Sequence, residues 1–557
     1  MRMSLFCYFC SPIFNLLRMF GKNCSRVIRA GLGMMLVFCS GTAGSQIYNE
    51  ESLKFSQVIN WIDKYYVDDV DQKKIVETAI IKMLHSLDPH SSYLTRDEVQ
   101  AMNEPLQGNF EGIGVSFNIL DDTIFIISPI PGGPSEKVGI MAGDRIVKIG
   151  SENVGGVGIR TSDVYDKLRG KKGTKVGVSI VRRSVPGLLD FTITRDKIPI
   201  FSVDADYMLD DKTGYIKINR FAYTTPDEFR DALGELKKQG AENLVLDLAG
   251  NGGGYLDVAI KIADEFLDDG KLIVYTEGAN SPKSSFTATG RGGFQNGKLV
   301  IIVDEGTASA SEIVAGAIQD WDRGIIVGRR SFGKGLVQRP LKLIDSSMIR
   351  LTIARYYTPS GRLIQKPYSD GYDSYAHELI NRFDDGELSG EDKATFADSL
   401  RYETLTGHRT VYGGGGIMPD FFVPIDTTYI SDYYRMILNR GIFNTFVLGY
   451  VDRHRGELNA KFPNFESFNS DYTVSPSIMD EMTRFAADEG LEYDADGFET
   501  SEEYLELLVK AYIARDLWTT SAFYEVVNQV NPAVLKAKEV LDDAGSYQAV
   551  LQNLHEE

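Results

Sequence analysis

Groups suited to nucleophilic chemistry are concentrated between residues 304 and 338, in DEGTASASEIVAGAIQDWDRGIIVGRRSFGKGLVQ. Ser309 follows an apolar run and precedes a helix-like segment, and Lys334 lies between two glycines and apolar neighbours. Desolvation by such neighbours lowers the pKa of a lysine, and a neutral lysine can act as the general base for a serine. Gln338 can hold the amine through its amide oxygen. The pattern suggests a Ser309–Lys334 pair, although most lysines are solvated surface charges, and Gln338 by itself carries no prediction.

Ser309 also has a structural interpretation. Ser-Ala-Ser-Glu at 309–312 fits a helix capping box, and a helix start favours developing negative charge. Both interpretations stay open, because a cap can hold a nucleophile in place. Thr307 and Ser311 are alternative hydroxyls. A histidine base is disfavoured, because all six histidines lie outside the expected core: His85, His90, His377, His408, His454 and His555.

A glycine-rich loop follows another expected strand, in LDLAGNGGGYLD. No lysine follows the glycines and the spacing is not GxGxxG, so nucleotide binding is disfavoured. The loop instead suits an oxyanion hole, in which an amide such as that of Gly254 stabilises a tetrahedral intermediate. Since the chain also has no HExxH-type pair, we expect neither zinc nor any other cofactor.

Several elements must position these residues. Helical periodicity covers 50–100, and short strands with glycine turns and one helical segment cover 103–196. Strands and helices alternate from 198 to about 366, which predicts a layered α/β core. The charged segment 370–407 is expected to be a mobile insertion, and the pattern from 429 onward is helical.

Composition narrows the class of protein. A chain of 557 residues predicts several domains, and a net charge of −19 argues against nucleic acid as a partner. All four cysteines precede residue 46, in a basic, apolar and then small-residue segment typical of an export signal. We expect cleavage after Ser45; a retained membrane anchor, lipidation at Cys39 or a later start at Met19 are alternatives.

The chain resembles the C-terminal processing (tail-specific) serine peptidases, a Ser-Lys catalytic type. The motifs are TASASEI, VGRRSFGKGLVQ and ARYYTPSGRLIQ. The resemblance implies that Ser309 is the nucleophile, Lys334 the general base and Gln338 its support. It also implies an oxyanion hole formed by the amide of Ala310 and that of Gly254 or Gly253. One departure is Ala249, where the family often has arginine.

The strand-rich module is similar to the family's PDZ domain, with FEGIGVSF as its carboxylate-binding loop. The resemblance implies that amides near Ile113, Gly114 and Val115 hold a substrate's C-terminal carboxylate. The expected partners are therefore proteins or peptides with exposed non-polar C-termini. The expected location is the periplasm or cell envelope, and a homodimer stays open.

The expected fold is a multi-domain α+β chain with a crotonase-like, layered ββα peptidase core, a PDZ-like β module and helical terminal segments. The expected activity is that of an exported serine endopeptidase which forms an acyl-enzyme; the alternative is a non-catalytic PDZ scaffold or chaperone. The expected parts are a signal peptide or anchor (1–45), an N-terminal helical domain (46–102), a PDZ domain (103–196), a peptidase core (197–369), a charged insertion (370–410), a return to the core (411–428) and a C-terminal helical domain (429–557).

Overall fold

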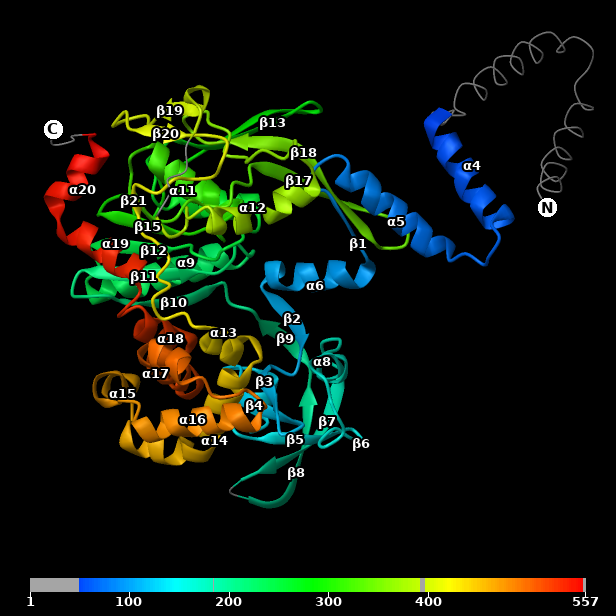
Figure 1. The fold of residues 1–557 in the computed structure, drawn as a ribbon, viewed down its shortest axis with the longest axis vertical. Helices are drawn as coiled ribbons and strands as arrows, with labels where there is room; N and C mark the ends of the chain where they lie inside the picture. Colours follow the sequence, from blue (N-terminus) through cyan, green and yellow to red (C-terminus); the bar gives the residue numbers. More distant parts are fainter. Residues whose placement is uncertain (1–49, 184, 391–395, 554–557) are drawn as a thin grey trace, which may run out of the picture. The chain divides into compact units, whose positions relative to one another are not determined.

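The computed structural model describes residues 50–183, 185–390 and 396–553 (Figure 1). The expected export signal at 1–45 lies outside these residues. Among the helices of the described ranges, none is both long and apolar enough to cross a membrane. The chain divides into two units, residues 1–80 and 81–557.

The first unit contains helix α4 (Glu50–Tyr65) and the beginning of α5 (Gln72–His85). Both helices occur where the periodicity predicts them. No residue of α4 is buried, and Phe55 and Trp61 are exposed on it.

The centre of the second unit is a six-stranded sheet in the order β10-β11-β12-β15-β16-β21. Neighbouring strands from β11 to β21 are parallel, whereas β10 is antiparallel to β11. Every residue of β11, β15 and β16 is buried, as expected for a sheet that is covered on both faces. The strands are β10 (Val203–Met208), β11 (Thr213–Ile218), β12 (Asn243–Asp247), β15 (Leu299–Val303), β16 (Ile325–Gly328) and β21 (Phe421–Phe422).

Alternate side chains of these strands enter different cores, because successive residues of a strand point to opposite faces. Leu244 and Leu246 pack in one hydrophobic cluster with α9, α10 and α11, whereas Val245 packs in another with α19 and α20. The helices are α9 (Thr225–Gln239), α10 (Leu256–Asp264), α11 (Ala310–Asp320), α19 (Pro532–Asp542) and α20 (Ala544–Leu551).

A second sheet also contributes to the cluster that contains α11. Ile273 of β13 and Tyr356 of β18 pack there with the residues of α11. All the residues of α11 are buried, which is typical of a helix enclosed on every side. The strands of this sheet are β1 (Ser92–Leu94), β13 (Leu272–Gly278), β14 (Ser281–Thr287), β17 (Leu336–Lys342) and β18 (Met348–Tyr357).

The β-rich module has a sheet in the order β3-β4-β5-β7-β8, so β3 is an edge strand. Helix α6 (Arg96–Gln107) precedes the module and continues past residue 102, where the sequence predicted the end of the helical domain. The elements of the module are β3 (Val115–Leu120), β4 (Thr123–Pro129), α7 (Pro134–Lys137), β5 (Arg145–Ile149), β6 (Glu152–Asn153), α8 (Thr161–Leu168), β7 (Lys175–Arg182) and β8 (Val185–Thr194); β2 (Asn109–Gly112) pairs with β9 (Asp196–Pro199) on either side of it.

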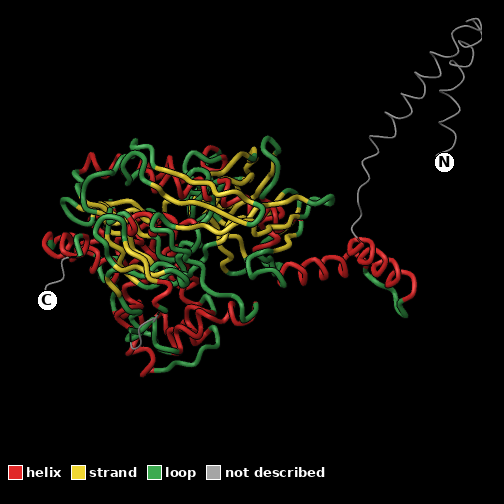
Figure 2. Tube along the Cα trace, turned by 90° about the horizontal axis from the view of Figure 1, so that it is seen from above, coloured by secondary structure: helices red, strands yellow, loops and turns green. Residues whose placement is uncertain are grey.

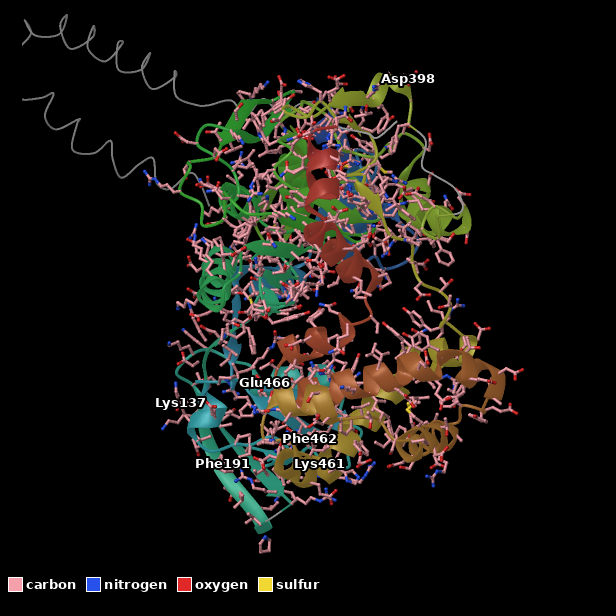
Figure 3. The ribbon with its side chains drawn as sticks, turned by 90° about the vertical axis from the view of Figure 1, so that its left-hand side faces the viewer. Lys137, Phe191, Asp398, Lys461, Phe462 and Glu466 are labelled. Carbon is pink, nitrogen blue, oxygen red and sulfur yellow. The ribbon has the colours of Figure 1, made fainter. Side chains whose placement is uncertain are left out.

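The C-terminal region is helical, as predicted. Its helix α14 (Ile442–Lys461) contacts the β-rich module, because Leu448 is buried in a cluster with Leu120 and Phe125. Arg145 forms an ion pair with Asp452 of the same helix over 2.8 Å. Figure 3 labels Phe191 of the module and Lys461 at the end of α14 in the same part of the view. The other helices are α13 (Asp432–Asn439), α15 (Phe465–Asp471), α16 (Pro476–Asp488), α17 (Ala495–Leu517) and α18 (Thr520–Val527).

The charged segment after residue 370 contains helix α12 (Tyr372–Asp384), in which Tyr375 and Arg382 are buried. The expectation of a mobile segment is therefore wrong for this helix. Short strands β19 (Arg401–Glu403) and β20 (Thr410–Tyr412) pair with each other after it. Figure 2 shows helices and strands distributed through the second unit, which is a multi-domain α+β arrangement.

Candidate active site

Ser309 lies at the junction between the loop after β15 and the first residue of α11. Its backbone has φ 56° and ψ −111°, a conformation that is unfavourable for a residue with a Cβ. Such strain persists only where the surrounding contacts hold the chain in place.

Glu312 supplies those contacts. It is fully buried, and its Oε2 accepts the backbone N–H of Ser309 over 2.7 Å and that of Lys334 over 2.9 Å. Its Oε1 accepts the N–H of Gly333 over 2.7 Å and the hydroxyl of Ser331 over 2.5 Å. Burial raises the pKa of Glu312, and these hydrogen bonds act against the rise. The glutamate of the predicted capping box thus connects the start of helix α11 to the loop that carries Lys334.

Tyr356 of β18 makes a second connection between the same two segments. Its hydroxyl lies 3.0 Å from the carbonyl oxygen of Ser309 and 2.5 Å from that of Lys334. The side chain is buried, and burial raises the pKa of its hydroxyl well above the ordinary value. The hydroxyl therefore stays protonated and can donate to one of the two carbonyl groups.

Lys334 is placed in an environment that favours its neutral form. Burial, and then the positive charge of Arg350, lower the pKa of Lys334 to about 8, although Glu312 and Asp88 act in the opposite direction. A lysine with this pKa is substantially neutral near pH 8 and can accept a proton.

Gln338 has a different partner from the expected one. Its Oε1 accepts a hydrogen bond from Nη2 of Arg350 over 3.3 Å, and its Nε2 is buried without a hydrogen-bond partner in the described part of the chain. The interpretation that this oxygen holds the amine of Lys334 stays a prediction. Gln338 nevertheless lines the same pocket as Lys334 and Ser309.

The glycine-rich loop lies against the Ser309 turn. A Cβ added to Gly253 would lie 2.9 Å from the Cβ of Ser309. The N–H of Gly253 already donates to Oδ1 of Asn251 over 2.9 Å. Phe221 and Gly254 form a parallel bridge. In this bridge the N–H of Phe221 donates to the carbonyl oxygen of Gly253, and the N–H of Tyr255 donates to that of Phe221. The N–H of Gly254 takes no part in it. The geometry therefore favours Gly254 over Gly253 as the donor that works with Ala310.

The other two hydroxyls have structural roles. Thr307 is buried and donates to the carbonyl oxygen of Leu248 over 2.9 Å, and Ser311 is buried and donates to that of Asn251 over 2.8 Å. Both bonds fasten the Ser309 turn to the glycine-rich loop. Near Ala249, where the family often has arginine, Lys217 donates to Asp247 over 3.0 Å and to the carbonyl oxygen of Ala249 over 2.6 Å.

These groups meet in one pocket of about 450 Å³. Helix α6 covers one side of it with Met102, Asn103 and Leu106. Ser309, Lys334 and Gln338 lie on its wall with the glycine-rich loop, and the remaining lining residues include Tyr255, Leu256, Ala310, Ile313, Leu336, Val337, Pro340, Met348, Arg350 and Tyr356. The structure thus brings together every expected residue of the peptidase site.

The expected carboxylate-binding residues lie elsewhere, immediately before and at the start of edge strand β3. Gly114 has φ 74°, and its carbonyl oxygen accepts the N–H of Ile130 over 3.0 Å. The carbonyl oxygen of Ile113 accepts the N–H of Ser135 over 3.1 Å. These two hydrogen bonds fix the conformation of the loop. Val115 is the first residue of β3, and one edge of this strand is unpaired in the sheet.

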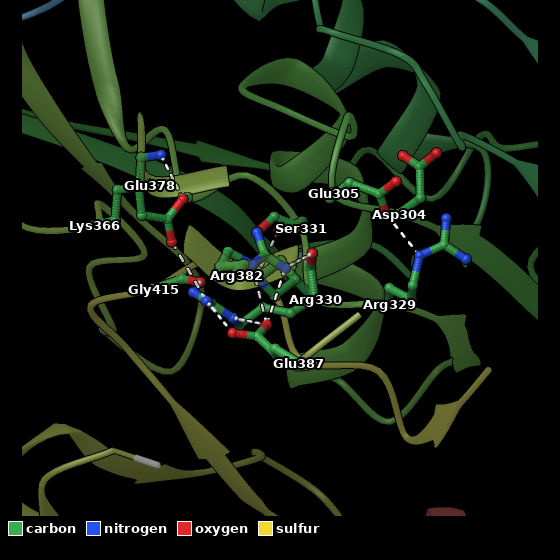
Figure 4. A network of polar contacts seen from close by, with 12 residues as sticks. Asp304, Glu305, Arg329, Arg330, Ser331, Lys366, Glu378, Arg382, Glu387 and Gly415 are labelled. Atoms are coloured by element: carbon green, nitrogen blue, oxygen red, sulfur yellow. Dashed lines mark hydrogen bonds and ion pairs between the residues drawn. The ribbon is translucent and has the colours of Figure 1, made fainter. Parts of the chain in front are cut away.

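Helix α12 of the charged segment supports the chain just before Lys334. Arg382 donates to the carbonyl oxygen of Arg330 over 2.7 Å, and Arg330 pairs with Glu387 over 2.7 Å (Figure 4). Lys366 pairs with Glu378 over 2.8 Å and lies 4.0 Å from the ring centre of Phe332. The segment is therefore part of the structure around the site.

Sequence reasoning missed the groups that come from distant segments. Asp88 accepts bonds from the N–H groups of His90 and Ser91 and from the hydroxyl of Thr352 in β18. His90 bonds to the Tyr375 hydroxyl over 2.7 Å, and burial followed by the charge of Lys334 lowers the pKa of His90 to about 3. The unusual LDPHSSYL stretch was the available signal, although a turn explained it equally well.

Four family models match parts of the chain. The model of peptidase family S41 matches residues 212–371, a PDZ domain model matches 125–182, and the model of the activating protease CtpB N-terminal domain matches 39–98. Residues 433–519 match a family of unknown function.

Several characterised or solved proteins are similar along the sequence. The carboxy-terminal processing protease CtpA of Bacillus subtilis is 35% identical over 61% of this chain and 73% of its own length. The carboxy-terminal-processing protease of Bartonella bacilliformis is 36% identical over 58% and 75%. The solved PDZ domain of the carboxy-terminal protease of Vibrio cholerae, in complex with a peptide, is 34% identical over 16% of this chain and 99% of that chain, with a TM-score of 0.16.

The fold and these matches define a serine peptidase that carries a PDZ domain. The chain belongs to peptidase family S41 and is a homologue of the C-terminal processing proteases CtpA and CtpB.

Proposed function

We propose that the protein is an exported endopeptidase that binds protein C-terminal tails through its PDZ domain and cleaves them through an acyl-enzyme on Ser309. The observation that carries the proposal is the shared Glu312 acceptor, which fixes Ser309 and Lys334 on the wall of one pocket. The N-terminal segment 1–45 supports export by its composition.

In the proposed reaction, neutral Lys334 takes the proton of the Ser309 hydroxyl while its oxygen attacks the carbonyl carbon of the substrate. The N–H groups of Ala310 and Gly254 stabilise the resulting oxyanion. The C–N bond breaks and the leaving amine takes the proton from Lys334. Lys334 then activates a water molecule that hydrolyses the ester.

Tail binding is supported by the edge position of β3. An extended peptide can add to its unpaired edge, beside helix α8, while the amides near Ile113, Gly114 and Val115 receive the terminal carboxylate. The side chains of Phe117 on β3 and Tyr165 on α8 lie in contact, with ring centres 5.5 Å apart. These rings offer apolar contacts for a non-polar tail.

The core also supports the finer description of a crotonase-like, layered ββα peptidase fold. Strands of both sheets and helix α11 contribute side chains to one hydrophobic cluster, which brings two sheets and a helix into one core. This description stays our proposal.

The test uses the full chain and a denatured protein with an exposed non-polar tail. We expect cleavage by the wild type and none by Ser309→Ala, Lys334→Ala or Lys334→Arg, because a guanidinium does not lose its proton at working pH. Equal cleavage by wild type and Ser309→Ala would refute the peptidase site. Tail binding retained without any cleavage would instead favour a scaffold.

Two further measurements test recognition and location. Substrates with an amidated C-terminus should be cleaved less efficiently than those with a free carboxylate, and equal rates would contradict capture of the terminus. Cell fractionation with sequencing of the mature N-terminus tests export. Recovery of the full chain in the cytoplasm would refute it.

A further inference from the structure

The active-site pocket contains a guanidinium to which the described residues supply no counter-ion. Arg350 lines the pocket, and its guanidinium donates to Oε1 of Gln338 over 3.3 Å and to the sulfur of Met102 over 3.5 Å. Both contacts are long, and a guanidinium has five N–H donors. No carboxylate in the described part of the chain forms an ion pair with it, and burial alone lowers the pKa of Arg350.

The neighbouring carboxylates are already occupied. Asp88 accepts four hydrogen bonds, from the N–H groups of His90 and Ser91 and from the hydroxyls of Ser91 and Thr352. Glu312 is buried behind the Ser309 turn and accepts four others. Among the described residues, neither of them forms an ion pair with Arg350, whose guanidinium contacts are those to Gln338 and Met102.

Gln338, beside Arg350, adds an unsatisfied donor to the same pocket. Because its oxygen accepts from Arg350, its Nε2 remains buried without a partner in the described residues. A buried donor without an acceptor is unfavourable, so an acceptor supplied by a bound molecule would be stabilised there. The pocket walls next to these donors include Met102 and Met348, which can cover an aliphatic stem.

We propose that Arg350, with Nε2 of Gln338, binds an acidic side chain of the substrate within three residues of the scissile bond. The inference rests on the proposed function, since it assigns a substrate preference to that site. A guanidinium binds a carboxylate through two parallel hydrogen bonds, and such charge-assisted bonds are the strong ones. An exclusive preference for non-polar residues would leave Arg350 without a carboxylate partner and Nε2 of Gln338 without an acceptor among the described residues.

The experiment uses the full chain and a series of peptides with one free non-polar C-terminus and one known cleavage site. Glu, Gln or Lys is placed in turn at each of the three positions on either side of the scissile bond. At one position we expect kcat/KM for the Glu peptide to exceed that for the Gln peptide by about 10- to 100-fold. A ratio near one, or below one, at all six positions overturns the inference.

Charge reversal provides the decisive variant. At that position, Arg350→Gln should bring the Glu-to-Gln ratio close to one, and Arg350→Glu should prefer Lys over Glu. Arg350→Lys keeps the charge but loses the paired geometry, so it should retain only part of the preference. Because each readout is a ratio within one variant, a general loss of activity does not imitate it.

The outcomes separate the two proposals. A wild-type preference that persists unchanged in Arg350→Gln and Arg350→Glu overturns the role of Arg350, while Ser309-dependent cleavage leaves the proposed function intact. If no peptide shows cleavage that depends on Ser309, the proposed function fails and the inference fails with it. Thermal unfolding of each variant identifies one that does not fold, in which case the wild-type ratio and Arg350→Lys decide.

Discussion

The backbone N–H groups of Ser309 and Lys334 donate to the same carboxylate oxygen, Oε2 of Glu312. A helix start and a loop from a later part of the chain are thereby held at a fixed separation by one side chain. The same contact maintains the unfavourable backbone conformation of Ser309.

Replacement of Glu312 should therefore affect both stability and activity. Glu312→Gln places an amide nitrogen opposite N–H and O–H donors, and we expect a loss of about 2–5 kcal/mol in the free energy of unfolding. Urea unfolding followed by kinetics on the folded fraction measures the two effects. Glu235→Gln, on the exposed face of helix α9, is the matched control. Equal stability and activity of the two variants would contradict the assigned role.

The pH dependence of cleavage should follow Lys334. Its pKa of about 8 means that the neutral amine becomes scarcer as the pH falls, so kcat/KM should decrease about tenfold per pH unit well below pH 8 and level off above it. The charges that act on this amine are those of Arg350, Glu312 and Asp88, and the nearby His90 is neutral. A pH–rate profile between pH 5.5 and 9.5, a range of about four units, measures the inflection.

The same profile tests a histidine base. His90 has a pKa lowered to about 3, so it stays neutral and contributes no inflection in this range. A flat profile, or an inflection near the ordinary histidine pKa of about 6.5, would contradict Lys334 as the base.

The glycine-rich loop offers a matched pair of substitutions. A Cβ at Gly254 would lie 2.2 Å from the carbonyl oxygen of Phe221, whereas a Cβ at Gly252 meets nothing within 4 Å. Gly254→Ala must displace the N–H that we assign to the oxyanion, and we expect kcat to fall about 10²- to 10³-fold. Gly252→Ala should fall much less. Steady-state kinetics of both variants decides, and similar rates would argue against Gly254.

The contact between the PDZ domain and helix α14 should contribute measurable stability. Leu448→Ala opens a cavity between Leu120 and Phe125, and we expect a cost of about 2–4 kcal/mol in the free energy of unfolding. Amide hydrogen exchange in β4 should accelerate at the same time. Leu535→Ala, on the exposed face of α19, is the control. Unchanged exchange in β4 would show that the contact is energetically unimportant.

Much of the fold follows from local patterns. Continuous apolar runs such as 299–303 became buried parallel strands, and the periodicity of 50–65 became a helix. Ser309, Lys334 and the glycine-rich loop could also be predicted from the sequence, because each lies in an unusual local combination of small residues.

Other features depend on tertiary contacts that no local pattern encodes. The charge-rich composition of the segment after residue 370 suggested mobility. In the structure, however, Arg382 donates to the carbonyl oxygen of Arg330, and Glu387 forms an ion pair with Arg330. The amide oxygen of Gln338 turned towards Arg350, whose approach depends on the pairing of β17 with β18. Composition cannot reveal such register-dependent partners.

The contact of Phe125 with Leu448 also bears on the order in which the protein is made. A ribosome completes the PDZ strands long before it reaches α14, because the strands of the peptidase core are encoded between them. Throughout that interval the side of the PDZ sheet around Phe125 lacks its native cover. The nascent chain therefore displays an apolar surface at Leu120 and Phe125 until α14 emerges.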